Sequence, residues 1–323
     1  MINLSLRLKR SRLSGKEIIR NTLMGISIRT PLIHSLPLSQ HCECHVWLKM
    51  ESSQPTGSFK LRSAENICRH YAERGATAFI SSSGGNAGIA VAHCGRKLEL
   101  PVTVVVPEST SARAKELIEQ EGARLIVHGK VWSEANDYAL SLATDNIICV
   151  HPFDHPLLWE GISTIVDEVI SEGVKPDAVI LSIGGGSMLS GIAQGLEKHQ
   201  LGHIPLYAVE THGTASLHAS LNAGKLVRLD KVSGIATTLA ASQVCENVFN
   251  VARRLDVRSM LVSDQEALQA CRRFLDDHRV LTEPACGVSL SLLYDRKIRF
   301  NAADNVLVIV CGGASVTLEG IAG

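Results

Sequence analysis

The chain has 323 residues, which is enough for one large or two moderate domains. Its 32 basic and 32 acidic residues balance, which argues against a protein built to bind nucleic acid or an anionic membrane. Nine irregularly spaced cysteines without a secretory signal indicate reduced thiols in the cytoplasm, and no apolar run reaches the roughly 18 residues of a membrane helix. A small basic cluster near the start, read as a solvated tail, consists of Arg7, Lys9, Arg10 and Arg12.

Short apolar segments rich in β-branched residues alternate with amphipathic segments along most of the chain. The apolar segments predict strands at residues 46–49, 77–80, 102–106, 125–127, 147–150, 178–183, 206–209 and 306–310. The amphipathic segments predict helices at residues 61–73, 111–121, 133–143, 157–172, 188–199 and 264–277. This alternation predicts an α/β fold in which helices cover parallel sheets. No repeat, low-complexity stretch or flexible linker marks a domain boundary.

The segment Thr56-Gly57-Ser58-Phe59-Lys60 places a lysine at the start of the helix predicted at 61–73. A lysine close to helix-terminal amides and an aromatic ring suits an amine that must lose its proton and attack a carbonyl. The alternative is an ordinary solvated lysine at a helix start.

A run of three glycines, Gly184-Gly185-Gly186, follows the buried strand at 178–183 and precedes Ser187, Met188 and a helix. Glycines let the backbone approach a ligand closely, and helix-terminal amides attract anions, so this turn is typical of a phosphate site. It lacks the lysine of a Walker loop and the spacing of a dinucleotide-binding loop. A tight turn without a ligand is the alternative.

Two further turns follow strands. Ser83-Gly84-Gly85-Asn86 combines hydroxyls, bare backbone and an amide that could hold a carboxylate, although Asn86 could instead cap a helix. Cys311 precedes Gly312 and Gly313 at the carboxyl end of the last strand, where open α/β sheets bind ligands. A small buried hydrophobe is the alternative for Cys311.

Taken together and in this order, the lysine segment and the three turns resemble the fold type II pyridoxal-phosphate enzymes, and most closely the L-serine/L-threonine dehydratases (serine ammonia-lyases). The resemblance runs from about residue 30 to residue 317. It also includes Trp47-Leu-Lys-Met-Glu51, Pro152-Phe-Asp154, Trp159-Glu-Gly161, Val209-Glu-Thr211 and Glu283-Pro-Ala-Cys-Gly287. The last of these segments is expected to open a helix with Pro284 in its first turn, and Cys286 is expected to serve in packing.

The resemblance implies two open, twisted, mostly parallel sheets flanked by helices, as in the tryptophan synthase β-chain. It implies a large cofactor-binding domain at residues 1–53 plus 158–323, a small domain at residues 54–157, and an active site in the cleft between them. It further implies a homodimer, an amino-acid substrate, and no nucleic-acid or membrane partner.

The resemblance also assigns roles to single residues. Lys60 is expected to form the Schiff base with pyridoxal 5'-phosphate and then act as the base. Phe59 is expected to pack against the pyridine ring, Asn86 to bond its phenolic oxygen, and Cys311 to face its nitrogen. Backbone donors to the phosphate are expected from Gly184, Gly185, Gly186, Ser187 and Met188. The substrate carboxylate is expected at Ser83, Gly84 and Asn86.

The implied reaction is deamination of L-serine to pyruvate and ammonia, and of L-threonine to 2-oxobutyrate and ammonia. A thiol at Cys311 cannot hold the ring nitrogen as a cation, which favours elimination over transamination. Serine racemisation, β-replacement in the manner of cysteine synthases, and a catalytically silent cofactor-binding protein are the alternatives.

Three further features concern the substrate turn, a cation site and the segment at residues 41–45. Gly84 stands where some members have alanine, which predicts an enlarged site or looser substrate placement. The family often binds a monovalent or divalent cation, here expected at Glu210 with carbonyls near Thr214 and Ile235. The run of possible ligands at residues 41–45 is expected to be a turn rather than a zinc site, because neighbours on an extended chain point to opposite faces.

Overall fold

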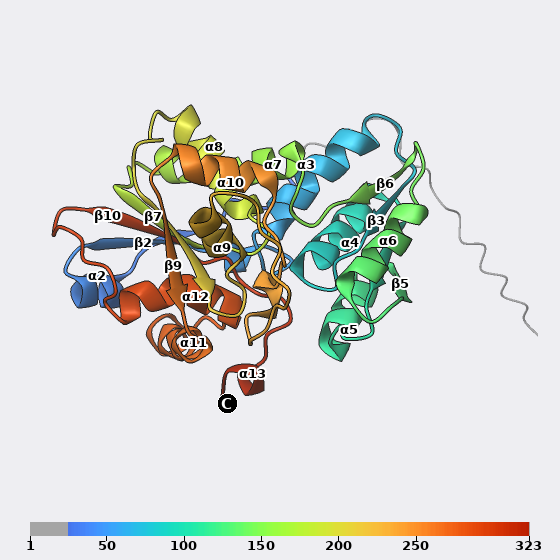
Figure 1. The fold of residues 1–323 in the computed structure, drawn as a ribbon. Coiled ribbons are helices and arrows are strands. Elements are labelled where there is room, and N and C mark those ends of the chain that lie inside the picture. Colours follow the sequence, from blue (N-terminus) through green and yellow to red (C-terminus); the bar gives the residue numbers. More distant parts are fainter. Residues whose placement is uncertain (1–24, 323) are drawn as a thin grey trace, which may run out of the picture.

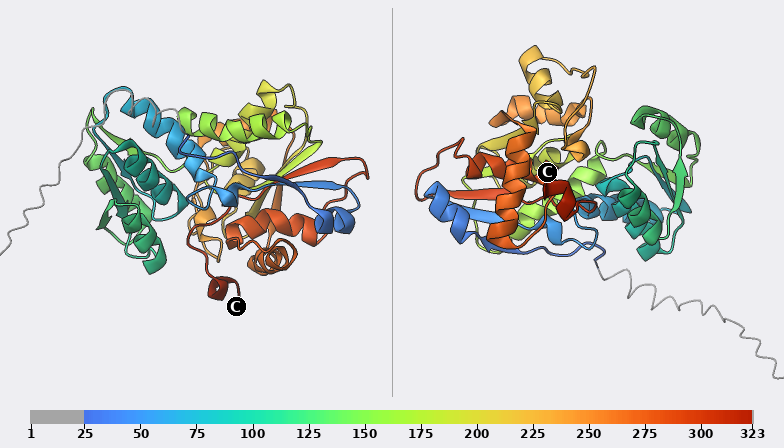
Figure 2. Two further views of the ribbon diagram at one scale, coloured as in Figure 1. Left: turned by 180° about the vertical axis from the view of Figure 1, so that it is seen from behind. Right: turned by 90° about the horizontal axis from the view of Figure 1, so that it is seen from below.

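The computed structural model describes residues 25–322, so the predicted basic cluster formed by Arg7, Lys9, Arg10 and Arg12 lies outside the described residues. Figures 1 and 2 show two bodies side by side, each built around its own sheet. The predicted fold class, two mostly parallel sheets with helices on their faces, is confirmed.

The larger sheet has six strands. Its order is β1 (Leu32–His34), β2 (His45–Lys49), β10 (Asn305–Ile309), β7 (Ala178–Ser182), β8 (Leu206–Thr211) and β9 (Val257–Val262). All neighbours are parallel except β1, which pairs antiparallel with β2 at one edge. The last strand of the chain, β10, therefore lies inside the sheet, between two strands formed much earlier in the sequence.

The smaller sheet has four parallel strands, in the order β5 (Arg124–Val127), β4 (Val102–Val106), β3 (Ala78–Ser81) and β6 (Ile147–Val150). All four come from the part of the chain assigned to a small domain. The exact domain boundaries stay a prediction.

Helices on both faces bury the sheets, with α7, α8 and α10 on one face of the larger sheet and α11 and α12 on the other (Figure 1). Their bounds are α2 (Leu36–Cys42), α3 (Lys60–Ala72), α4 (Asn86–Leu98), α5 (Ala112–Gln120), α6 (Trp132–Ser141), α7 (Pro156–Ser171), α8 (Ser187–Lys198), α9 (Ser216–Ala223), α10 (Glu246–Arg254), α11 (Asp264–His278), α12 (Pro284–Tyr294) and α13 (Leu318–Ala322). Two short 3-10 turns are η1 (Glu51–Ser53) and η2 (Thr237–Leu239). Among the helices of residues 25–322, none is both long and apolar enough to cross a membrane.

Strands β7 and β8 are buried at every residue, which explains their unbroken apolar sequence. The strands missed by the sequence analysis, β1 and β9, are the two edges of the larger sheet and are largely half-buried or exposed. Edge strands carry a mixed pattern, so periodicity does not reveal them.

Helix α2 corrects one local prediction. Residues 41 and 42 end this helix, and Glu43 follows in the left-handed region with φ of 58°, so the segment is not extended before His45. The region from residue 43 to residue 44 is the turn into β2.

Helix α3 lies at the junction of the two bodies. It packs against α4 of the smaller body and against α7 of the larger one. Lys60 is its first residue, so the position of this helix decides where the lysine points.

Candidate active site

The turns predicted to carry the chemistry meet at the carboxyl ends of β3, β7 and β10. The backbone N–H of Phe59 donates to the carbonyl of Cys311 at 3.2 Å, and the Gly313 N–H donates to the Gly57 carbonyl at 2.9 Å. The Ala314 N–H donates to the Asn86 side chain at 3.0 Å. These bonds join three distant parts of the sequence, and a bond from Lys60 to Ser187 adds the turn after β7 as a fourth.

The Lys60 amine points at the glycine-rich turn. Its Nζ donates to the Ser187 hydroxyl at 3.0 Å and to the Pro152 carbonyl at 2.7 Å, and it lies 5.0 Å from the centre of the Phe59 ring. Burial lowers the pKa of Lys60 from 10.5 to about 8, and the nearby thiols of Cys245 and Cys311 oppose that shift only partly. Two acceptors match the two N–H bonds of a neutral amine, which leaves its lone pair for a nucleophilic or basic role.

The turn from Gly184 to Gly186 has no space for side chains. A methyl group on Gly185 would lie 2.1 Å from the Phe153 ring, and one on Gly186 would lie 2.4 Å from Val248. Gly186 also has a φ of 100°, which favours glycine. Within residues 25–322 the amides of these three glycines have no protein acceptor, and no side chain caps α8 after them. Free amides at a helix start are suited to hold a phosphate.

Asn86 is held from two sides and does not cap α4, so the capping alternative is wrong. Its Nδ2 donates to Glu283 Oε1 at 2.9 Å while its Oδ1 accepts from Ala314, and the N-cap position belongs to Gly85. The same Glu283 oxygen accepts from the Thr238 hydroxyl at 2.7 Å. Burial raises the pKa of Glu283 to about 7, although both hydrogen bonds favour its charged form.

Glu283 and Thr238 are the site residues that sequence reasoning missed. Glu283 was recognised only as part of a motif expected to open a helix, and it does precede α12, whose first residue is Pro284. Thr238 lies in η2 within a long irregular segment, where no periodicity or motif distinguishes it.

Cys311 is buried at the end of β10. A contact with the thiol of Cys286 and burial both raise the pKa of Cys311 well above its usual range, so the group is a neutral thiol. Cys286, expected to serve in packing, lies in the core on α12.

The turn from Ser83 to Gly85 corrects the expectation of an enlarged site. A methyl group on Gly84 would lie 2.5 Å from the hydroxyl and 2.7 Å from the methyl group of Thr110, so this threonine already fills the space. The Ser83 hydroxyl accepts from the Gly85 N–H at 3.3 Å. The Ser83 hydroxyl and the Gly84 backbone line the same turn that presents Asn86.

Glu210 is fully buried at the end of β8, and its two oxygens accept from the amides of Leu217 and His218 at the start of α9, each at 2.8 Å. Burial raises the pKa of this carboxyl group to about 7 despite these bonds. Thr214 belongs to the same turn, and the Ile235 N–H donates to Asp264. A cation would have to share the Glu210 oxygens with helix amides, and the cation site at Glu210, Thr214 and Ile235 stays a prediction. Across residues 25–322, no three His, Cys, Asp or Glu side chains are grouped as a metal site, and this includes residues 41–45.

The assembled groups suit a small molecule with a phosphate at one end and a carbonyl near Lys60. The free amides face the phosphate end, the lysine reaches the same turn, and Asn86 and the neutral Cys311 thiol lie at the neighbouring strand ends.

Comparisons with known proteins agree with this arrangement. Residues 24–312 match the family model described as pyridoxal-phosphate dependent enzyme. The chain is 40% identical over 326 residues to an L-serine dehydratase of Dictyostelium discoideum, covering 94% of this chain and 93% of that one. It is 39% identical to the human L-serine dehydratase/L-threonine deaminase, covering 91% and 93%. A crystal structure of an L-serine ammonia-lyase from Rhizomucor miehei superposes with a TM-score of 0.88 at 36% identity, covering 93% of this chain and 98% of that one.

Proposed function

Because this chain belongs to the family of pyridoxal-phosphate-dependent enzymes, we propose that it is an ammonia-lyase acting on L-serine and L-threonine. The products are pyruvate and ammonia from serine, and 2-oxobutyrate and ammonia from threonine. The observation that carries the proposal is the Lys60 amine, directed at the Ser187 hydroxyl beside a turn of unpaired glycine amides.

Pyridoxal phosphate, when bound, supplies an aldehyde for amines and a ring that withdraws electrons from the α-carbon of the substrate. Lys60 is proposed to hold the aldehyde end, and the amides from Gly184 to Met188 the phosphate. Phe59, Asn86 and Cys311 are proposed to line the ring. The charge of a phosphate dianion is matched there by the free amides and the dipole of α8.

Other residues are proposed to bind the substrate carboxylate and to remove the proton from its α-carbon. The turn formed by Ser83, Gly84 and Asn86 is proposed to receive the substrate carboxylate. The Lys60 amine is proposed to take the proton from the α-carbon, a role that its lowered pKa of about 8 supports. The neutral Cys311 thiol cannot support a persistent positive charge on the ring, and this supports departure of the β-hydroxyl over transamination.

The test is an assay of ammonia and 2-oxo acid from both amino acids, with chiral analysis of the remaining substrate. We expect pyruvate from L-serine and 2-oxobutyrate from L-threonine, and loss of both activities in Lys60→Ala. D-serine formed in excess of pyruvate would support a racemase instead, and wild-type turnover by Lys60→Ala would refute the role of Lys60.

We further propose that the enzyme works as a cytoplasmic homodimer. The proposal rests on the resemblance to the dehydratases and on cysteines that are all unpaired in the described residues. Sedimentation of the purified chain tests the dimer, and assays with the cation exchanged or chelated test the site at Glu210.

A further inference from the structure

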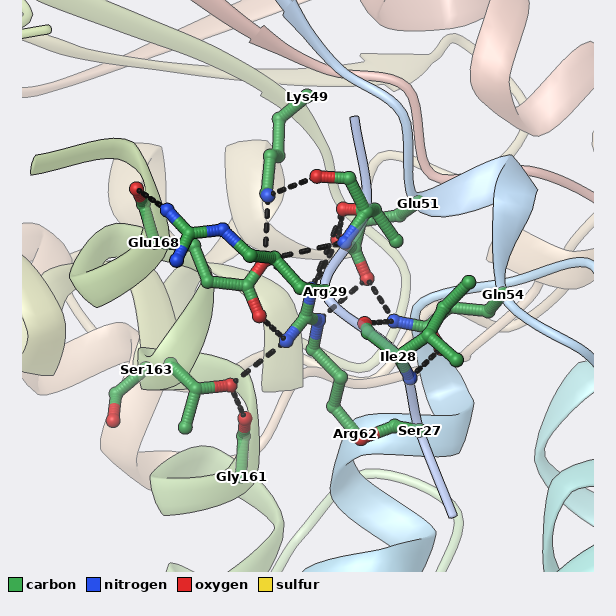
Figure 3. Close-up of polar contacts among 12 residues, drawn as sticks. Ser27, Ile28, Arg29, Lys49, Glu51, Gln54, Arg62, Gly161, Ser163 and Glu168 are labelled. Carbon is green, nitrogen blue, oxygen red and sulfur yellow. Dashed lines mark hydrogen bonds and ion pairs between the residues drawn. The ribbon is translucent and has the colours of Figure 1, made fainter. Parts of the chain in front are cut away.

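A buried group of four charged side chains lies behind the first turn of α3. Arg62 forms two bonds with Glu51, from Nε at 2.8 Å and from Nη2 at 2.9 Å. It forms two more with Glu168 on α7, at 2.6 and 2.8 Å, and Glu168 also accepts from Lys49 at 2.5 Å. Figure 3 shows Lys49, Glu51 and Glu168 gathered around Arg62. The side chains of Lys49 and Glu51 have no exposed surface, and that of Arg62 is 3% exposed.

The Arg62–Glu51 pair closes the base of the segment that carries the active lysine. Glu51 begins this segment in η1 and Arg62 ends it in the first turn of α3, with Thr56 to Lys60 between them. Inside the segment, the hydroxyls of Thr56 and Ser58 are buried and find no hydrogen-bond partner among the described residues. These two side chains therefore do not help to hold the segment. Its anchors are backbone hydrogen bonds to Val310, Cys311 and Gly313, the hydrogen bonds of the Gln54 side chain with the Ile28 backbone, and the Arg62–Glu51 ion pair.

The bonds to Glu168 fix α3 against α7, which also fixes an acceptor of Lys60. A methyl group on Gly161 would lie 2.4 Å from the Arg62 carbonyl, so the two helices touch backbone to backbone at this point. Pro152, whose carbonyl accepts from the Lys60 amine, lies just before the start of α7. The Arg62 contacts therefore hold both the donor and the acceptor of this hydrogen bond.

We propose that Arg62 is a positioning residue, whose guanidinium sets the rotation and depth of the first turn of α3 and so directs Lys60 at the glycine-rich turn. The arrangement demands arginine, since two carboxylates are each held by two bonds from one planar group, and the ammonium of a lysine cannot reproduce that geometry. The inference rests on the proposed function of Lys60.

The test compares holoenzyme variants inside one network. Arg62→Lys and Glu51→Gln weaken the ion pair at the base of the lysine segment. Lys49→Met removes a donor to Glu168 and to the Thr30 carbonyl, but Lys49 contacts neither Arg62 nor Glu51. Glu121→Gln, which removes a partner of Arg96 and His93 on the smaller body, is the remote control. Each variant is assayed well below its unfolding temperature. The measurements are kcat and KM for L-serine and the fraction of cofactor fixed to Lys60 by borohydride, mapped by peptide mass spectrometry.

For Arg62→Lys and Glu51→Gln we expect kcat to fall between about tenfold and hundredfold, because a displacement of about 1 Å has such an effect. KM should change much less, and the fraction of cofactor fixed to Lys60 should fall. In Lys49→Met, Glu168 keeps both of its bonds to Arg62, so this variant should lower the unfolding temperature while kcat and the fraction of cofactor fixed to Lys60 stay near wild type. In Glu121→Gln, kcat and this fraction should also stay near wild type.

Two results separate the possible failures. If Arg62→Lys and Glu51→Gln only lower the unfolding temperature, as Lys49→Met does, the network is structural and the inference is wrong. Should Arg62→Lys not fold, Glu51→Gln alone decides. If borohydride does not fix the cofactor to Lys60 in the wild-type enzyme, the proposed function of Lys60 fails instead.

Discussion

The lowered pKa of Lys60 makes a quantitative prediction about amine reactivity. With a pKa of about 8, roughly a fifth of the Lys60 side chains are neutral at pH 7.4. An ordinary lysine with a pKa of 10.5 is neutral in only about 0.1% of molecules at that pH, so burial raises the reactive fraction by about 250-fold. Raising the pH from 7 to 9 should therefore carry Lys60 through its titration.

The assay is competitive acylation of the full-length protein freed of cofactor, with a limiting amount of acetic anhydride at a series of pH values. Peptide mass spectrometry then reports the labelling of Lys60 and of the exposed Lys225, which serves as the internal reference. The midpoint of the pH profile of Lys60 labelling is compared with that of Lys225. The midpoint is used instead of the rate because burial alone reduces the labelling rate of Lys60. We expect a midpoint near pH 8. A midpoint at pH 10 or above would refute the argument that burial prepares this amine.

Three further predictions concern the surroundings of the site and the scaffold. Gly185→Ala forces a methyl group against the Phe153 ring, and overpacking of about 1–3 kcal/mol should weaken cofactor binding roughly 5- to 150-fold in a fluorescence titration. Glu283 has a raised pKa, so it binds protons more tightly in the folded state, and its contribution to stability is lost as pH rises from about 4.5 through about 7. Glu283→Gln should remove up to about 3 kcal/mol of that pH dependence in unfolding experiments while keeping the acceptor for Asn86. Ser263→Ala breaks the capping box of α11 and should cost about 1 kcal/mol in urea unfolding without changing kcat.

Each of these predictions has a control or a contrary outcome. In Gly173→Ala the added methyl group meets no atom of the described residues within 4 Å, so this variant should leave cofactor binding unchanged. An unchanged slope of stability against pH in Glu283→Gln would show that burial does not govern this carboxyl group. A fall in kcat for Ser263→Ala would mean that α11 influences the site.

The sequence pattern predicted the central strands and long helices well, because complete burial and a 3.6-residue period leave clear signals. For α12 it indicated only the start, through the motif at Glu283 and Pro284, because this helix is buried on all sides and shows no apolar stripe. It missed the short α9, and the edge strands β1 and β9, whose exposure mixes polar and apolar residues.

The candidate site was predictable where glycines, a lysine or a strand end marked it. The partners of Asn86 were not, because Glu283 lies 197 residues away and Thr238 lies in an irregular segment. Likewise, Gly84 alone suggested free space, and only the packing showed Thr110 filling it. Contacts between distant segments depend on the three-dimensional arrangement, which local pattern does not encode.

The interior place of β10 has a consequence for how the protein is made. During synthesis, β2 and β7 emerge long before their common neighbour, and until residues 305–309 arrive each lacks its partner along one side. Such unpaired strands are prone to pair with other chains. Because Cys311 and the turn that contacts Phe59 follow this strand directly, the cofactor site is completed only after residues 311–313 have been translated. A ribosome-bound chain that ends before residue 305 should therefore fail to retain pyridoxal phosphate, and the arrival of β10 should be the step at which sheet closure and cofactor capture coincide.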